Sequence, residues 1–232
     1  MLRSLDEGLW VADGNFKAFG ISLGARMTVV RLPDQSLFVH SPIRLDDGLR
    51  AALDAAGPVR HLVAPNTFHH LFLGDYRDAY PDARLYGAPG VAAKRSDIAF
   101  DEVLSDEVPG ALAEVFDQAV LHGMPRFNEV LFCHRPTRSL LVTDCAFNIF
   151  ESPSLFTRLF FKGMGVYGRF GPSRLFRSTI KDHAALRASL DRVLLWNFDR
   201  VIVTHGIVLH SHGKRLLREA YAWLDPGARE TD

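Results

Sequence analysis

The sequence predicts an α/β protein in which two β-sheets pack together and helices cover them. Strand hairpins and strand–helix–strand units occur in both halves of the chain, and this mixture is typical of a layered sandwich. The chain has 232 residues, of which 47% are hydrophobic and 23% are charged, so it is long and apolar enough for a sizeable core. No linker and no short repeat interrupts the pattern, and we expect residues 1–232 to form one domain.

Composition excludes several classes of protein. The 27 basic and 27 acidic residues balance, which argues against a general nucleic-acid binder, because phosphate contacts need an excess of basic side chains. No apolar stretch approaches the roughly 18 to 20 residues of a membrane-spanning helix, and the first residues have no signal-peptide core. The two cysteines fit a reducing compartment. We therefore expect a cytoplasmic protein without a transmembrane segment.

The first half of the chain begins with strands. Short apolar runs between turn residues predict strands at 8–12, 27–32, 37–40, 61–64 and 83–86. The turn at 33–36 joins the second and third of these into a hairpin. Residues 46–56 predict a helix that Gly57 and Pro58 end, and a polar loop-to-helix segment follows the fourth strand.

The second half repeats this alternation. The same criterion predicts strands at 112–120, 129–134, 139–144 and 200–204, and apolar residues at helical spacing predict helices at 182–197 and 214–224. The middle two strands form a hairpin. Its register places Cys133 opposite Leu140 and away from Cys145, so we expect two buried free cysteines and no disulfide.

Polar side chains follow three of the predicted buried strands. Asn66, His69 and His70 follow the first of these strands, Asp144 follows the second, and His205 follows the third. Imidazole and carboxylate groups that converge from separate strand ends can hold one divalent cation. A metal-free polar network, in which Asp144 holds His205 by a hydrogen bond, is the alternative interpretation.

The order of these elements matches that of a known superfamily. An opening hairpin and a helix precede an apolar strand that leads to a His-rich turn. A later hairpin ends in Leu141-Val142-Thr143-Asp144, and a late apolar strand ends in His205-Gly206. In these features the chain resembles the metallo-β-lactamase superfamily over residues 8–224. The resemblance implies a metallo-β-lactamase-like four-layer αββα sandwich of two mixed sheets.

Four short motifs narrow the resemblance. They are Ala64-Pro65-Asn66 with His69-His70, Phe127-Asn128-Glu129, Asp144 with Asn148, and Thr204-His205-Gly206. Together they resemble an uncharacterised subfamily with a degenerate metal motif.

The chain departs from the superfamily's usual His-x-His-x-Asp-His motif. Laid on this sequence, the motif positions hold Asn66, Phe68, His70 and Leu71. Two of the three ligands of the first metal are therefore absent. The third would lie just before the middle hairpin, where the chain has Pro125 and Arg126.

What the resemblance leaves is a site for one metal ion. Its ligands would be His70, Asp144 and His205, with His69 in place of His70 if the turn is shifted by one residue. Three protein ligands with an open position are typical of a catalytic site, and zinc, iron or manganese would suit it.

These features predict a metal-assisted hydrolase that acts on a small, anionic substrate with cation-activated water as the nucleophile. Beside Asp144, Glu129 would be a fourth ligand, an orienting partner of an imidazole or a general base. Asn66 and Asn148 would contact the substrate. A non-catalytic binding or scaffold protein on the same fold, without a metal, is the competing hypothesis, and the missing ligands favour it.

The segment between Glu151 and Asp182 has a distinctive composition. It contains no acidic residue, and its basic residues, Arg169 and Arg174 among them, alternate with aromatic residues. One interpretation is a lid over the site, in which Arg169 and Arg174 bind an anionic substrate. An interfacial membrane patch, a partner-binding surface and a solvated loop are the alternatives.

Overall fold

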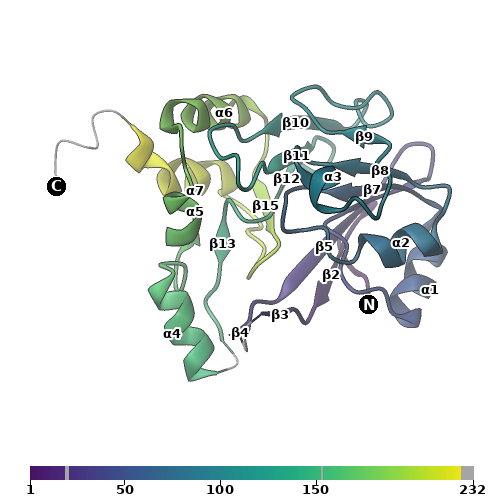
Figure 1. The fold of residues 1–232 in the computed structure, drawn as a ribbon, viewed down its shortest axis with the longest axis horizontal. Coiled ribbons are helices and arrows are strands. Elements are labelled where there is room, and N and C mark those ends of the chain that lie inside the picture. The colour runs from purple at the N-terminus through teal and green to yellow at the C-terminus, as the bar shows by residue number, and fades with distance from the viewer. Residues whose placement is uncertain (19–20, 153, 226–232) are drawn as a thin grey trace.

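The computed structural model describes residues 1–18, 21–152 and 154–225, and shows two large sheets with helices on their outer sides (Figure 1). Within these residues, one sheet has seven strands in the order β1-β2-β5-β6-β7-β8-β9, and the other has four in the order β10-β11-β12-β15. Both sheets mix parallel and antiparallel pairs. The predicted sandwich of two mixed sheets is confirmed.

The first half of the chain builds the larger sheet. Its strands are β1 (Arg3–Asp6), β2 (Leu9–Gly14), β5 (Ala25–Arg31), β6 (Leu37–His40), β7 (Val59–Ala64), β8 (Arg84–Gly87) and β9 (Glu102–Val103). The short strands β3 (Lys17–Ala18) and β4 (Ile21–Ser22) pair with each other. The helices of this half are α1 (Asp47–Ala56), α2 (Leu73–Ala79) and α3 (Val91–Lys94).

The second half builds the smaller sheet from β10 (Phe116–Val120), β11 (Val130–His134), β12 (Ser139–Val142) and β15 (Arg200–Val203). Strands β13 (Phe147–Asn148) and β14 (Phe170–Gly171) form a separate pair. The helices are α4 (Leu155–Gly163), α5 (Arg174–Ser178), α6 (His183–Leu195) and α7 (Gly213–Ala220), and a 3-10 turn covers Ala222–Leu224.

Alternation along the strands of the smaller sheet explains the layers. Phe132, Leu141 and Ile202 pack with the larger sheet, whereas their neighbours Cys133 and Leu140 pack with the residues of α6 and α7. Successive side chains of a strand point to opposite faces, so each strand contributes to two apolar layers. Inside the sandwich, the ring of Phe38 from the larger sheet lies 4.5 Å from that of Phe116 and 5.4 Å from that of Phe132.

The structure differs from the prediction in several elements. Strands β1 and β9 and helix α3 were not predicted, and the helix expected at 214–224 ends at Ala220. The strand expected at 112–120 begins only at Phe116, because the N–H groups of Leu112 and Ala113 bond back to the carbonyl of Pro109 in a turn. The segment after Glu151 contains two helices, where one of our interpretations had a loop. The side-chain oxygens of Ser154 and Ser173 cap α4 and α5. Such N-caps stabilise a helix by accepting a hydrogen bond from a free N–H group of its first turn.

The cysteine prediction is confirmed. Cys133 pairs with Leu140 across the β11–β12 hairpin, and both Cys133 and Cys145 are buried free thiols. A separate finding concerns the helices: among the described residues, none is both long and apolar enough to cross a bilayer.

His134 lies at the hairpin end of β11, opposite the end of the sheet where Asp144 lies. Its ring Nδ1 is 2.7 Å from the Thr137 hydroxyl, and the residue is only 4% exposed. Burial lowers the pKa of His134 from 6.5 to about 4, against a raising effect of Asp6. Above pH 6.5 the imidazole is neutral in both the folded and the unfolded chain. Between pH 6.5 and about 4, only the unfolded chain takes up the proton.

We therefore expect His134 to make the fold acid-sensitive. Lowering the pH from 7 to 5 should cost the wild type about 2 kcal/mol of unfolding free energy through this group alone. The His134→Gln variant should lose that much less over the same range, measured by urea denaturation at both pH values. His210→Gln, at an exposed position, serves as the control and should behave as the wild type. Equal pH dependence in His134→Gln and wild type would contradict the prediction.

Candidate metal centre

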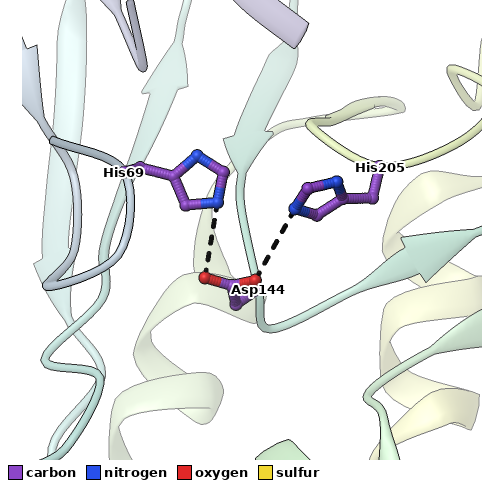
Figure 2. Close-up of side chains that lie close together, drawn as sticks. All are labelled: His69, Asp144 and His205. Carbon is purple, nitrogen blue, oxygen red and sulfur yellow. Dashed lines mark ion pairs between the residues drawn. The ribbon is translucent and has the colours of Figure 1, made fainter. Parts of the chain in front are cut away.

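Three side chains that follow strands meet at one edge of the sandwich: His69 beyond β7, Asp144 beyond β12 and His205 beyond β15 (Figure 2). The Nε2 atom of His69 lies 3.4 Å from one oxygen of Asp144, and the Nε2 atom of His205 lies 3.7 Å from the other. One donor atom from each residue lies within 4.8 Å of the others. The two imidazoles thus face one carboxylate from either side.

The orientation of His205 is fixed on three sides. Its Nδ1 atom is 3.0 Å from the carbonyl oxygen of Gly24. A carbonyl only accepts hydrogen bonds, so Nδ1 carries the proton and Nε2 presents its lone pair to Asp144 in the neutral ring. Phe147 stacks on the imidazole with ring centroids 5.1 Å apart and planes at 10°. Burial, and then the neighbouring His69, lower the pKa of His205 to about 4, with Asp144 opposing them.

Gly206 allows the chain to pass closely behind His205. Its φ of +107° is in the region that favours glycine. A Cβ atom there would lie 2.1 Å from the carbonyl oxygen of Asn148. Asn148, which we expected to contact substrate, is buried at this crossing, and its amide nitrogen donates to the carbonyl of Ile207 at 2.6 Å. In this position Asn148 orders the loop that carries His205.

Ser41 and Asn66 hold His69. The hydroxyl of Ser41, a residue with a positive φ of 55°, lies 2.9 Å from the Nδ1 atom of His69. The Oδ1 atom of Asn66 accepts the backbone N–H groups of Phe68 at 2.8 Å and His69 at 2.9 Å. The turn after β7 is therefore shaped by an asparagine side chain. No feature of the sequence had marked Ser41 as a partner of His69.

Asn66 also reaches the carboxylate. Its amide nitrogen donates to the hydroxyl of Thr143 at 2.9 Å and to Asp144 at 2.7 Å. With two hydrogen bonds donated and two accepted, this fully buried side chain has used its hydrogen-bonding capacity within the protein. The geometry assigns it to holding His69 and Asp144 together, whereas we had expected it to contact substrate.

Glu129 lies beneath the loop that carries Asp144. Its fully buried carboxylate accepts the backbone N–H groups of Thr143 at 2.7 Å, Asp144 at 3.0 Å and Cys145 at 2.8 Å. Burial and then the charge of Asp144 raise the pKa of Glu129 to about 6, while the N–H groups oppose this change. Of the three roles that we considered for Glu129, these contacts best match an orienting role. The group that Glu129 orients is the backbone around Asp144 and not an imidazole.

The charge of Asp144 is supported by its neighbours. Burial acts to raise the pKa of this carboxyl, but His69, His205 and the hydrogen bond from Asn66 act to lower it. The net direction is downward. The site thus presents a carboxylate between two imidazoles, a donor set that suits a divalent transition-metal ion.

His70 is placed differently from the other histidines. It is not part of the group of three donors, and its Nδ1 atom is buried without a hydrogen-bond partner among the described residues. Burial lowers the pKa of His70, and the nearby cations of Arg95 and Lys94 lower it further. Of the two histidines that we considered as ligands, His69 is the one that faces Asp144.

The expected substrate-binding arginines lie on the segment of α4 and α5. Arg169 donates to the carbonyl of Pro172 at 3.4 Å, and Arg174 donates to that of Gly163 at 3.1 Å. In the part of the chain that the structure describes, neither forms a hydrogen bond or an ion pair with the three donors. The segment nevertheless adjoins the site, because Phe147 packs with its apolar cluster and stacks on His205.

Arg26 is a contributor that the sequence did not reveal. One guanidinium nitrogen donates to the carbonyls of Val203 at 2.8 Å and Gly206 at 2.7 Å, and another pairs with Asp13 at 2.7 Å. Arg26 thereby fastens the larger sheet to the end of β15. In the sequence, Arg26 is only a charged residue at the start of an apolar run. The strand that we predicted there began at residue 27 and left Arg26 out.

Comparison with known proteins agrees with this architecture. The family described as "Domain of unknown function (DUF4336)" matches residues 6–167, and the chain belongs to this family. A metallo-β-lactamase from Pontibacter korlensis superposes with a TM-score of 0.66 at 11% identity, covering 97% of this chain and 98% of that one. Among curated proteins, none matches the sequence.

Two further solved structures have the same fold. The metallo-β-lactamase FIM-1 from Pseudomonas aeruginosa, in its mono-zinc form, gives a TM-score of 0.62 at 13% identity over 99% of this chain and 95% of that chain. The Flv1 flavodiiron core from Synechocystis gives 0.66 at 11% identity, over 97% of this chain and 60% of that one. The predicted metallo-β-lactamase fold is confirmed.

The buried carboxylate of Glu129 generates a testable prediction. In Glu129→Gln the amide nitrogen would face backbone N–H donors, so at least one of them would lose its acceptor. We expect the free energy of unfolding to fall by about 2–3 kcal/mol, measured by urea denaturation at pH 8. Glu219→Gln, at an exposed ion pair with Arg215, should change it by less than about 0.5 kcal/mol. Equal stability of the two variants would contradict the role given to Glu129.

Proposed function

We propose that this protein is a metal-dependent hydrolase in which His69, Asp144 and His205 hold one divalent cation. The observation that carries the proposal is the fixed tautomer of His205. Because Nδ1 donates to Gly24, the Nε2 lone pair points at a carboxylate oxygen that is also an acceptor. Two acceptors that face each other at 3.7 Å favour a cation between them.

The distances fit such an ion. Two ligand atoms that each lie about 2.1 Å from a tetrahedral cation are about 3.4 Å apart. The two imidazole–carboxylate distances, 3.4 and 3.7 Å, are close to this value. Two imidazole nitrogens and one carboxylate oxygen suit zinc, iron or manganese, and three protein ligands leave a position open.

The chemistry follows from this donor set. When bound, such a cation acts as a Lewis acid that polarises a substrate carbonyl or phosphoryl oxygen and activates water. The chain's own residues supply the orientation. Asn66 keeps His69 and Asp144 adjacent, Glu129 fixes the Asp144 backbone, and the Gly24 carbonyl keeps the Nε2 lone pair of His205 directed inward.

A small, anionic substrate fits the charge around the site. The segment that adjoins His205 through Phe147 carries basic residues and, between Glu151 and Asp182, no acidic ones. A positive surface beside the site raises the local concentration of anions. The fold supports a single metal ion as well, since the similar FIM-1 enzyme was crystallised in a mono-zinc form.

Metal content tests the ligand set. We expect protein prepared without a His-tag to bind about one equivalent of zinc, iron or manganese. His69→Ala and His205→Ala should each weaken binding by about a hundredfold or more, because two ligands remain. The matched control is His70→Ala, which should keep the wild-type affinity. The measurement is elemental analysis together with titration calorimetry.

The adjacent histidines make this test decisive. Loss of the metal in His70→Ala but not in His69→Ala would identify His70, and not His69, as the ligand. No metal in the wild type, even after incubation with each of the three ions, would overturn the proposal. It would favour the alternative of a non-catalytic binding protein on the same fold.

Hydrolytic activity is a separate prediction. The metal-loaded protein should hydrolyse at least one member of a panel of carboxylate-bearing esters, lactones and phosphoesters. Chelation of the metal or the Asp144→Ala substitution should reduce the rate by about a hundredfold or more, since the cation is then lost or misplaced. Binding of metal with no turnover across the panel would contradict the catalytic part of the proposal.

A further inference from the structure

Helix α4 exposes an unusual amount of apolar surface. Leu155, Phe156 and Leu159 are 67%, 64% and 58% exposed. On the opposite side, Thr157 and Phe161 are buried, and Phe161 belongs to a small apolar cluster with Ile149 and Val166. The helix lies at the rim of the molecule, apart from both large sheets (Figure 1). Single exposed leucines are common, but three large apolar side chains on two turns of one helix indicate a binding surface.

Basic residues flank this surface. Leu155 and Leu159 are one helical turn apart and share a side of α4, with Phe156 next to them. Arg158 and Lys162 are likewise one turn apart, and both are exposed along one edge of the apolar stripe. An apolar stripe with cationic side chains at its border is typical of helices that lie in a membrane interface.

The charge extends beyond the helix. Between Glu151 and Asp182 the basic residues are Arg158, Lys162, Arg169, Arg174, Arg177 and Lys181, and there is no acidic residue. All six side chains are exposed. Within the described part of the chain, none of them takes part in an ion pair. Arg174 also bonds to the end of α4 through the carbonyl of Gly163 at 3.1 Å, so α5 continues the positive surface.

We propose that α4 docks on the anionic surface of a lipid bilayer, with Leu155, Phe156 and Leu159 inserted between headgroups and Arg158 and Lys162 against their phosphates. A second copy of the chain is a poorer occupant, because a two-fold symmetric contact through α4 would bring the same cations of both copies together. Each basic residue at an anionic surface adds attraction, and the apolar stripe adds burial.

Vesicle binding tests this inference without any use of the metal site. The full chain should co-float with vesicles of phosphatidylcholine and phosphatidylglycerol, and much less with phosphatidylcholine alone. Binding should weaken as ionic strength rises. Because the proposal depends only on α4 and its charges, its failure would leave the proposed hydrolase unaffected, and the converse also holds.

Two sets of variants separate the apolar and the ionic contributions. The triple variant Leu155→Ser, Phe156→Ser, Leu159→Ser and the double variant Arg158→Glu, Lys162→Glu should each lower the partition coefficient by about tenfold or more. All five positions are exposed, so the fold should tolerate these changes, and circular dichroism would check this. The matched controls are Leu195→Ser, at an 83% exposed leucine of α6, and Arg50→Glu of α1. Both should bind as the wild type.

Site-specific labelling provides a second readout. The two native cysteines are buried, so an environment-sensitive fluorophore can be attached to a cysteine introduced by Leu159→Cys. Its emission should shift to the blue on addition of anionic vesicles, and the same label on Leu195→Cys should not respond.

Three results would overturn the proposal. The first is no binding to anionic vesicles at low ionic strength. The second is equal binding by the wild type and both α4 variants. The third is capture of the chain by a poly-glutamate peptide but not by vesicles, which would assign the surface to an acidic protein partner.

Discussion

The candidate site depends on one buried amide, that of Asn66, which joins the two sheets. Asn66 follows β7 of the larger sheet, and its side chain bonds to Asp144, which follows β12 of the smaller sheet, at 2.7 Å. The same side chain shapes the turn that carries His69. Because its four hydrogen bonds are made inside the protein, the relative position of an imidazole and a carboxylate from different sheets is set by one residue.

Two other buried side chains hold the loops of the site through hydrogen bonds to backbone groups. Glu129 accepts three consecutive N–H groups around Asp144, and Arg26 donates to two carbonyls around His205. Both are buried charged side chains, which cost free energy unless they are paired and hydrogen-bonded. Each is paired, Glu129 with N–H donors and Arg26 with Asp13 and carbonyl oxygens. The loops of two donors are therefore held whether or not a cation is bound.

Sequence patterning predicted the strands of the smaller sheet and the inner strands of the larger one, because buried strands have apolar runs, and it predicted the positions of Asp144 and His205, because polar residues follow the ends of such strands. The edge strands β1 and β9 were not predicted. It did not decide between His69 and His70, since that choice depends on which N–H groups Asn66 accepts. Ser41 and the carbonyl of Gly24 come from distant loops, and nothing local marks them as partners of histidines. Helices α4 and α5 were missed because basic and aromatic residues alternate along this segment, which hid the apolar stripe of α4 in the sequence.

The fold covers only a small part of α4. Of its apolar residues, Phe161 belongs to a small apolar cluster and Phe160 packs against it, whereas Leu155, Phe156 and Leu159 are largely exposed. Phe147 belongs to this cluster as a partly buried member and also stacks on His205. The ring that fixes one donor of the site is thus held by the same cluster that supports α4. A displacement of α4 that moves Phe147 would therefore also change the stacking contact that orients His205. Through Phe147, the exposed helix is coupled to the candidate metal centre.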